Sequence, residues 1–319
     1  MMAIEKQDQM IWGYLIHLGY NMWMEKNAPH IREYINASDA LRFDKPTFDE
    51  ILSRLAAVSA NTVVIDLGEG VLYESHPEIG VEGAWSVDQL RQELAKMRQM
   101  GLNPIPKLNF STAHDEWLGE YARCVSTKQY YEVCRDLIRE VIQIFDTPDF
   151  FHIGMDEETY MHQSAYLYAV VRQEDLWWHD LFFYLNEIES FGVRPWIWSD
   201  YIWNHPETFL KQMPHSVLQS NWYYGSFCPD HPDQLRYIEA YRLLDENGYD
   251  QVLTGSNWAM TENFPQTVDY GKTHLNPDRL LGFLQTVWKP TVSERKYRHF
   301  EAVDLIKEGR DRFYEGKNQ

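Results

Sequence analysis

Short apolar runs alternate with longer segments of helical periodicity from one end of the chain to the other. Most of these runs are continuously apolar rather than alternating polar and apolar, which is typical of parallel strands covered on both faces. The pattern predicts eight strands, at residues 10–16, 62–67, 103–110, 149–155, 194–199, 216–222, 251–258 and 280–288.

The segments between these strands carry the start and stop signals of helices. Three pairs have the spacing of a capping box, in which a side chain at the helix start accepts a backbone N–H bond: Thr47 with Glu50, Ser86 with Gln89, and Ser126 with Gln129. Apolar residues at helical spacing predict helices over 87–100, which Gly101 ends, and over 130–145, 233–248 and 292–314. We also expect the aromatic stretch 177–184 to be a buried helix face.

Eight strands, each followed by a helix, predict a single (β/α)8 TIM barrel. A doubly wound open sheet shares the same alternation, but it usually carries a Gly-rich phosphate loop after its first strand. The segment after the first predicted strand, GYLIHLGYN, contains no such loop. No Pro/Gly/Ser-rich linker divides the chain, so we expect one domain over residues 1–319, with the barrel from 10 to about 314.

Composition narrows the classes of partner. The net charge is −19, from 29 basic and 48 acidic residues, which disfavours nucleic acid and membrane surfaces and suits a neutral or cationic substrate better than an anionic one. Three cysteines without a CxxC pair support neither a zinc ribbon nor a disulfide framework. The N-terminus lacks the features of a signal peptide and no apolar stretch is long enough to span a bilayer, so we expect a cytoplasmic protein; a processed export form stays open.

Aromatic residues make up 15% of the chain, and their positions form a pattern. Trp12, Trp177 and Trp178 fall where core residues are expected. In contrast, four tryptophans fall at the ends of the last four predicted strands: Trp198, Trp222, Trp258 and Trp288. Because TIM-barrel sites lie at the C-terminal strand ends, this pattern predicts an aromatic-walled pocket. Trp23 and Trp117 follow the first and third strands at a greater distance.

The fourth predicted strand ends in FFHIGMDEETY, residues 150–160. Side chains alternate along a strand, so His152, Gly154 and Asp156 share one side, and Glu157 follows where the strand gives way to a loop. Two adjacent carboxylates near an enclosed site repel each other, which predicts that the pKa of at least one is raised toward the range of a general acid. The alternative is a solvated acidic cluster that caps the next helix. The place of the acidic pair among strand ends that carry Trp favours the interpretation as an active site.

Several segments resemble glycoside hydrolase family 20, the β-N-acetylhexosaminidases. HIGMDE, residues 152–157, is similar to the family signature H-x-G-[GA]-D-E, with Met155 where a small residue is usual. WIWSD (196–200) looks like the family's fifth-strand segment, and LLGFLQTVWKP (280–290) resembles its last strand. In KLNFSTAH, His114 stands in for the histidine of the third-strand loop.

The resemblance implies exo-acting, retaining hydrolysis in which the substrate's own 2-acetamido group is the nucleophile. Glu157 would be the general acid and base, and Asp156 would orient the acetamido group. The substrate would be a carbohydrate or glycoconjugate, and we expect neither a cofactor nor a metal. The positions at the strand ends predict a set of substrate-binding residues: His17, Asn109, His114, His152, Trp198, Asp200, Trp222, Tyr223, Trp258 and Trp288.

The residues that hold the sugar in this family are replaced here. The first strand offers His17 and Asn21 in place of an arginine, and the seventh shows Trp258-Ala-Met in place of Tyr-Leu-Asp. Trp288 is followed by Lys289 rather than by a serine and a sugar-binding glutamate. The identity of the sugar, GlcNAc, GalNAc or another, therefore stays open, as do the leaving group and the oligomeric state.

Three other functions remain open at this stage. Glu157 and Glu262 would be the acid and nucleophile of a conventional retaining glycosidase if their carboxyl groups lay about 5 Å apart. A barrel that only binds carbohydrate would also fit the replaced sugar-holding residues. A catalytic metal on His114, His152, Asp156 and Glu157 is disfavoured, since no HExxH or similar zinc spacing occurs.

Overall fold

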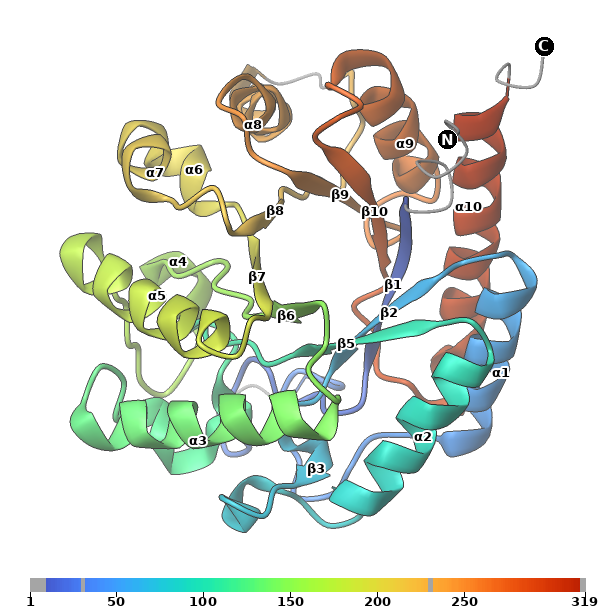
Figure 1. Ribbon diagram of the computed structural model, residues 1–319. Helices are drawn as coiled ribbons and strands as arrows, with labels where there is room; N and C mark the ends of the chain where they lie inside the picture. The colour runs from blue at the N-terminus through green and yellow to red at the C-terminus, as the bar shows by residue number, and fades with distance from the viewer. Residues whose placement is uncertain (1–9, 30–31, 229–231, 316–319) are drawn as a thin grey trace.

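The computed structural model describes residues 10–29, 32–228 and 232–315. Eight parallel strands close into a barrel in the order β1-β10-β9-β8-β7-β6-β5-β2 (Figure 1). They are β1 (Ile11–His17), β2 (Thr62–Asp66), β5 (Asn103–Lys107), β6 (Phe150–His152), β7 (Arg194–Trp198), β8 (Leu218–Ser220), β9 (Gln251–Ser256) and β10 (Leu280–Thr286). The closed parallel barrel confirms the predicted TIM fold and excludes the open sheet.

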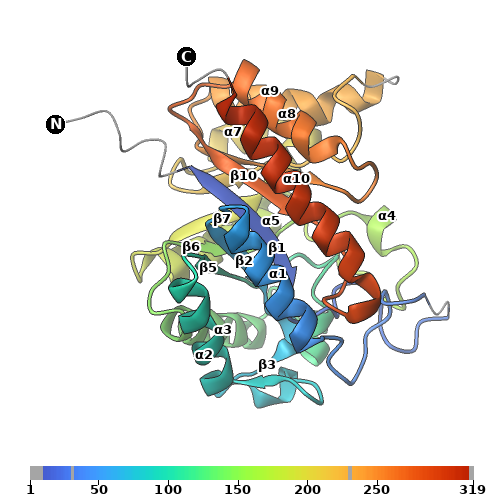
Figure 2. The same ribbon diagram turned by 90° about the vertical axis from the view of Figure 1, so that its right-hand side faces the viewer.

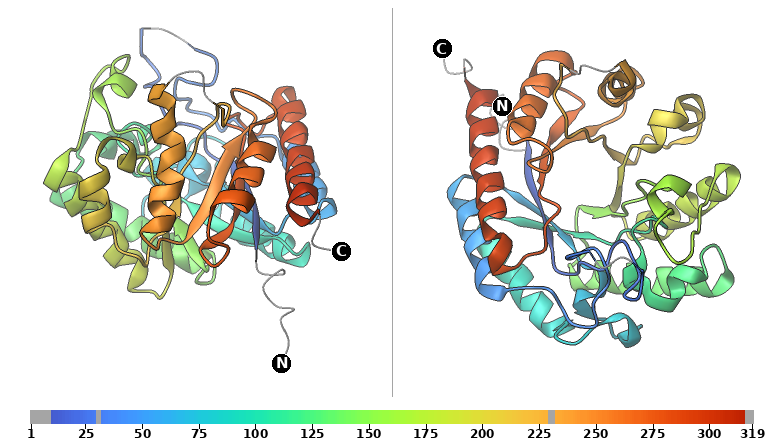
Figure 3. Two further views of the ribbon diagram at one scale, coloured as in Figure 1. Left: turned by 90° about the horizontal axis from the view of Figure 1, so that it is seen from above. Right: turned by 180° about the vertical axis from the view of Figure 1, so that it is seen from behind.

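Helices surround the barrel on the outside, as Figures 1 and 3 show from opposite sides. The long ones are α1 (Lys45–Ala57), α2 (Val87–Gln99), α3 (Lys128–Ile144), α5 (Glu174–Glu189), α8 (Leu235–Glu246), α9 (Asn263–His274) and α10 (Lys296–Tyr314). Figure 2 shows α1 and α10 side by side over the outside of β1. The shorter helices are α4 (Tyr160–Gln163), α6 (Tyr201–Asn204) and α7 (Pro206–Gln212), and a two-stranded sheet joins β3 (Val71–Leu72) to β4 (Trp85–Ser86).

Two of the three predicted helix caps are wrong, one by three residues and the other by one. Ser86 does cap α2, accepting from Gln89 N at 3.1 Å. The cap of α1 is Asp44 rather than Thr47, because Pro46 suits the first turn of a helix that begins earlier. The cap of α3 is Thr127, since its neighbour Ser126 has a positive φ of 62° and turns its hydroxyl to Asp180 instead.

The buried core has two parts. Ile11, Val64, Ile105 and Trp196 belong to the group that fills the interior of the barrel. The larger part lies between the strands and the helices, and Trp12, Trp177 and Trp178 are buried in it as predicted. In the described ranges, no helix is both long enough and apolar enough to cross a membrane.

The strand that carries the acidic motif is shorter than its sequence predicts. β6 ends at His152 because the following backbone turns repeatedly into the left-handed region, at Gly154 (φ 70°), Met155 (φ 73°) and Glu157 (φ 58°). Positive φ is strained for a residue with a side chain, and such strain is often found at functional sites. The turns lead the chain out of the sheet at the rim of the barrel.

Candidate active site

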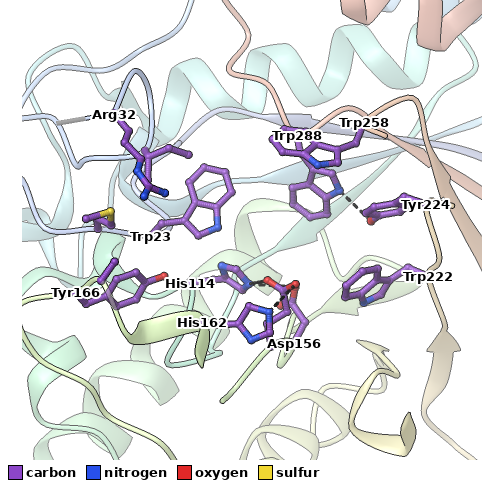
Figure 4. Close-up of a pocket in the computed structure, with 14 residues that line it drawn as sticks. Trp23, Arg32, His114, Asp156, His162, Tyr166, Trp222, Tyr224, Trp258 and Trp288 are labelled. Atoms are coloured by element: carbon purple, nitrogen blue, oxygen red, sulfur yellow. Dashed lines mark hydrogen bonds and ion pairs between the residues drawn. The ribbon is translucent and has the colours of Figure 1, made fainter. Parts of the chain in front are cut away.

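A pocket with a volume of about 380 Å³ opens at the C-terminal ends of the strands, within the range of small-molecule sites (Figure 4). Its walls come from connections that follow six strands: β1, β5, β6, β8, β9 and β10. The lining residues are Trp23, Met24, Arg32, Ile35, His114, Asp156, Glu157, His162, Ala165, Tyr166, Trp222, Tyr224, Trp258 and Trp288.

The two adjacent carboxylates, Asp156 and Glu157, both reach this pocket but are held by different contacts. The backbone N–H of Glu157 donates to Asp200 Oδ2 at 2.9 Å, which stabilises its left-handed conformation. The side-chain Oδ1 of Asp156 accepts from Asn109 Nδ2 at 2.9 Å. The positive φ of Glu157 thus lets two neighbouring residues present their carboxylates to one cavity, which an extended strand would point in opposite directions.

Asn109 is fixed in one orientation by its other contacts. Its Oδ1 accepts from the backbone N–H of Ser111 at 3.0 Å and of Met155 at 3.1 Å. The NH2 group of its side-chain amide therefore faces Asp156. Gly154 makes this possible, because a Cβ there would lie 1.9 Å from Asn109 Oδ1. Asn109 therefore positions Asp156 rather than lining the pocket itself.

The third acid of the motif, Glu158, faces away from the pocket. It forms an ion pair with the buried Arg172 and accepts from Thr112 N at 3.0 Å. Arg172 also pairs with Asp180 at 2.8 Å, which anchors the loop to α5. Asp156 and Glu158 are buried and Glu157 is half-buried, so the motif is not a solvated cluster.

Two histidines contact the carboxylates. His114 Nε2 lies 3.1 Å from Glu157 Oε2 and 3.3 Å from Asp156 Oδ2, and His162 Nε2 lies 3.3 Å from Glu157 Oε1. Burial alone would raise the pKa of Glu157, but its bonds to the two histidines outweigh this and hold the pKa below its usual range. Burial alone would lower the pKa of His114, but the charges of Asp156 and Glu157 raise it to about 10.

The expectation that mutual repulsion raises a pKa in the acidic pair is wrong for Glu157, because the histidines compensate its charge. A third carboxyl group, that of Asp200, lies behind the pair and has a raised pKa. Burial and the nearby charge of Asp156 raise the pKa of Asp200 to about 8. Asp200 is buried, its backbone follows β7, and its Oδ1 lies 3.4 Å from the indole nitrogen of Trp222.

Four aromatic rings, which we call the aromatic cage, stand on one side of the carboxylates: Trp222, Tyr224, Trp258 and Trp288 (Figure 4). Trp222 and Tyr224 stack with ring centroids 5.1 Å apart, and the indole nitrogen of Trp288 donates to the Tyr224 hydroxyl at 2.9 Å. Trp258 remains 48% exposed, with the Lys289 ammonium 4.3 Å from its ring centroid. Aromatic faces of this kind suit the apolar faces of a sugar ring.

Several predicted binding residues lie beneath or behind the pocket instead. Trp198 is buried under Trp288, at a centroid distance of 6.1 Å, and His152 packs on Trp198 at 4.3 Å. His17 is buried beside Asp66, its Nδ1 3.3 Å from the carboxylate. Tyr223 points outward, with its hydroxyl 3.3 Å from Gln234. Trp198 belongs to the side chains that fill the barrel interior, so it lies below the pocket, whereas Tyr223 packs between the strands and the helices because successive side chains alternate.

The residues that sequence reasoning missed come mostly from long connections. Tyr224 lines the pocket where Tyr223 was expected, because alternate side chains after β8 face the pocket, so Tyr224 joins Trp222 there. His162 belongs to the short helix α4, and Arg32 and Tyr166 lie in loops without a motif. Trp23, which follows the first strand, lines the pocket. Trp117 is buried instead, and its indole nitrogen donates to Asn109 O at 2.9 Å.

Two alternatives can be assessed from the geometry. Glu262 is exposed at the start of α9 and is not among the lining residues, so the pocket that contains Glu157 offers it no role as nucleophile. His114, Asp156 and Glu157 place one ligand atom each within 4.8 Å of one another, a composition that suits a divalent cation. In the structure these side chains contact one another directly, with His114 Nε2 3.1 Å from Glu157 Oε2 and 3.3 Å from Asp156 Oδ2.

Comparison with solved structures finds the same fold in hexosaminidases of glycoside hydrolase family 20. An exo β-N-acetylglucosaminidase of this family from Vibrio harveyi, solved with N-acetylglucosamine, matches with a TM-score of 0.64 and 15% identity, over 94% of this chain and 54% of its own. A β-N-acetylhexosaminidase from Bacteroides fragilis matches with a TM-score of 0.63 and 14% identity, over 93% and 65%. A family 20 enzyme from Streptomyces coelicolor matches with a TM-score of 0.64 and 12% identity, over 94% and 64%.

These likenesses establish the fold. The chain spans between about half and two thirds of the length of these three proteins. No family model matches the chain, and no curated protein matches its sequence. Activity and substrate therefore have to be argued from the pocket.

Proposed function

We propose that the protein is a glycoside hydrolase that releases a terminal β-linked 2-acetamido sugar by a substrate-assisted, retaining mechanism. The observation that carries the proposal is the pair Asp156 and Glu157, which enter one aromatic pocket with different partners. Asn109 and His114 hold Asp156, whereas Asp200, His114 and His162 hold Glu157. The two carboxylates share His114 but differ in their other partners, and this difference suits two separate tasks.

In this proposal the aromatic cage holds the sugar and Asp156 accepts a hydrogen bond from the acetamido N–H. The acetamido carbonyl oxygen attacks the anomeric carbon, the bond to the leaving oxygen breaks, and Glu157 protonates that oxygen. Asp156 stabilises the positive charge that develops on the cyclic oxazolinium. Water then adds to the anomeric carbon while Glu157 accepts its proton, which restores the acetamido group and retains the configuration.

In this proposal the proton that Glu157 donates comes from one of the two histidines that contact it. In the unliganded protein Glu157 is ionised because His114 and His162 compensate its charge, and both histidines have a raised pKa. One of them therefore has to return a proton to Glu157 when the substrate excludes water from the pocket. His162 is the more accessible donor, with a side chain that is 44% exposed.

The experiment that tests the proposal is turnover of a panel of aryl glycosides, comparing β-GlcNAc and β-GalNAc with β-glucoside and β-galactoside. We expect hydrolysis of the 2-acetamido sugars only, and a loss of about 10²–10⁴-fold in Glu157→Gln, which is the usual contribution of a general acid. Glu262→Gln is the matched control and should stay close to wild type. Turnover of sugars without the acetamido group, with sensitivity to Glu262→Gln, would instead support a conventional nucleophile.

A carbohydrate-binding protein without activity is the second candidate, and the ionised state of Glu157 favours it, because a carboxylate that never regains its proton cannot act as an acid. Calorimetric binding of GlcNAc to the wild type and to Glu157→Gln separates the two. Equal binding by both proteins, with no turnover of any glycoside in the panel, would establish the binding function.

A further inference from the structure

The pocket continues past the carboxylates to a second wall. Figure 4 shows this wall on the side of His114 and Asp156 that is opposite the aromatic cage, and its labelled members are Trp23, Arg32 and Tyr166. If the cage holds the sugar that is cleaved off, this wall faces the group on the other side of the scissile bond. The inference below therefore rests on the proposed function.

The second wall is held together by contacts between two loops that are far apart in sequence. The carboxylate of Glu25, in the connection after β1, accepts from the backbone N–H of Leu167 at 3.1 Å and of Tyr168 at 3.4 Å, in the connection after β6. The hydroxyl of Tyr166 donates to Ala113 O at 2.8 Å. Trp23 is placed by edge-on ring contacts, to Tyr20 at 5.3 Å and to His114 at 6.2 Å.

Arg32 is anchored in this wall by its backbone, while its guanidinium remains available. The backbone N–H of Arg32 donates to Asn36 Oδ1 at 2.8 Å, and Asn36 Nδ2 donates to Glu25 O at 3.1 Å. Over residues 10–29, 32–228 and 232–315, no hydrogen bond or ion pair engages the Arg32 guanidinium. Arg42 in the same connection differs, since its guanidinium donates to Tyr20 O, Asn36 O and Asn21 Oδ1.

An uncompensated arginine in a pocket wall is notable in a chain with a net charge of −19. Glu116, which is close in sequence to His114, pairs with Arg123 instead, at 3.8 Å. A guanidinium has a planar set of donors that matches carboxylate, sulfate and phosphate oxygens, and Arg32 is exposed at the pocket wall, so these donors are open to a ligand. The net charge alone suggested a neutral or cationic substrate, so the local charge of this wall points the other way.

We propose that the second wall is the leaving-group subsite and that Arg32 selects a leaving group carrying an anion: a carboxylate, a sulfate or a phosphate ester. Trp23 and Tyr166 provide the ring faces against which that group lies, and Arg32 pairs with its negative charge. The substrate is then a terminal 2-acetamido sugar joined to an acidic sugar or to another acidic group.

The test compares two aryl glycosides of whichever 2-acetamido sugar the panel shows to be turned over, one with a 4-carboxyphenyl and one with a 4-carboxamidophenyl leaving group. For each protein we take the ratio of kcat/KM for the carboxylate glycoside to kcat/KM for the carboxamide glycoside. We expect this ratio to be about ten-fold higher in wild type than in Arg32→Gln, because one hydrogen-bonded charge pair contributes about that much. Arg32→Lys should keep part of the ratio. Arg91→Gln, an exposed arginine on α2, is the control and should keep all of it.

The proposal is overturned if Arg32→Gln lowers kcat/KM for both glycosides equally, which a purely structural role predicts, or if wild type shows no preference. Sulfate and phosphate esters of the same aryl group show which anion is preferred. If the panel shows no turnover of any 2-acetamido sugar, the proposed function fails, and calorimetry with the 4-carboxyphenyl glycoside of β-GlcNAc then tests the subsite alone. Binding that Arg32→Gln weakens about ten-fold upholds an anion subsite, and absence of binding overturns it.

Discussion

His114 Nε2 lies 3.1 Å from Glu157 Oε2, in a contact that is buried on the histidine side and open to the pocket on the glutamate side. The same nitrogen is 3.3 Å from Asp156 Oδ2. One imidazolium thus compensates two adjacent carboxylates that would otherwise repel each other. This contact sets both the ionisation state of the pair and the pH range over which the site is stable.

The first prediction concerns the pH dependence of stability. The pKa of His114 is raised from 6.5 to about 10 in the folded protein, so its contribution is fully present below about pH 6.5 and is lost as the pH rises through 10. The melting temperature of wild type should therefore fall between about pH 6.5 and 10, and the part of this fall above about pH 9 lies beyond the titration of Asp200, whose pKa is about 8. At pH 7 the unfolding free energy of His114→Asn should be roughly 3–5 kcal/mol below that of wild type, because two carboxylates lose their partner. The variant should therefore melt at a lower temperature.

The difference between wild type and His114→Asn is the decisive measurement, and it is made by thermal denaturation at several pH values. The gap should narrow as the pH rises through 10, because wild type then loses the same ion pair. A gap that stays constant over that range would show that His114 is not protonated in the folded protein.

The second prediction concerns the role of Asp156. If it orients the acetamido group, Asp156→Asn should lower kcat for a 2-acetamido glycoside by about 10²–10³-fold, the usual cost of removing one group that stabilises transition-state charge. A thiazoline analogue of the cyclic intermediate should inhibit wild type and bind more weakly to the variant. Inhibition that is unaffected by the substitution would remove Asp156 from this role, provided that the variant melts within a few degrees of wild type.

The third prediction concerns the backbone beneath the pair. Gly154→Ala places a methyl group where Asn109 Oδ1 now lies, at 1.9 Å, in a residue with φ of 70°. We expect loss of activity as Asn109 and Asp156 move, and a fall in unfolding free energy. Gly101→Ala is the control, since it has a similar φ of 78° with no atom within 4 Å of the added carbon.

The control should cost only backbone strain, about 1–2 kcal/mol, and should leave activity unchanged. Gly154→Ala should cost about 1–3 kcal/mol more, as overpacking adds to the strain. Chemical denaturation and turnover together measure both effects. Equal stability and equal activity in the two variants would show that the contact between residue 154 and Asn109 is unimportant.

The fourth prediction is that activity does not depend on a metal. His114, Asp156 and Glu157 are close enough to hold a cation, but a cation would have to displace the proton of His114, whose pKa is raised to about 10. Dialysis against EDTA should leave turnover of the active glycoside within two-fold of the untreated protein. A loss of turnover that zinc or another divalent ion restores would show that these three residues act as metal ligands.

The architecture of this protein is largely contained in its hydrophobic pattern. All eight barrel strands lie where continuous apolar runs occur, because a strand buried on both faces needs apolar residues at successive positions. The acidic motif could also be located, since it follows one of these runs directly. Local signals were less reliable where two capping residues compete, as Asp44 with Thr47 and Thr127 with Ser126 show.

The composition of the pocket wall was decided by tertiary structure. Trp198 is the last residue of β7 and is buried in the barrel interior beneath the pocket, whereas Trp222 comes two residues after β8 and lines the pocket. His162 and Arg32 reach the site only through the folding of long loops, whose contacts join residues more than a hundred positions apart. Whether Glu157 is charged likewise depends on which histidines these loops bring to it, and local sequence carries no such information.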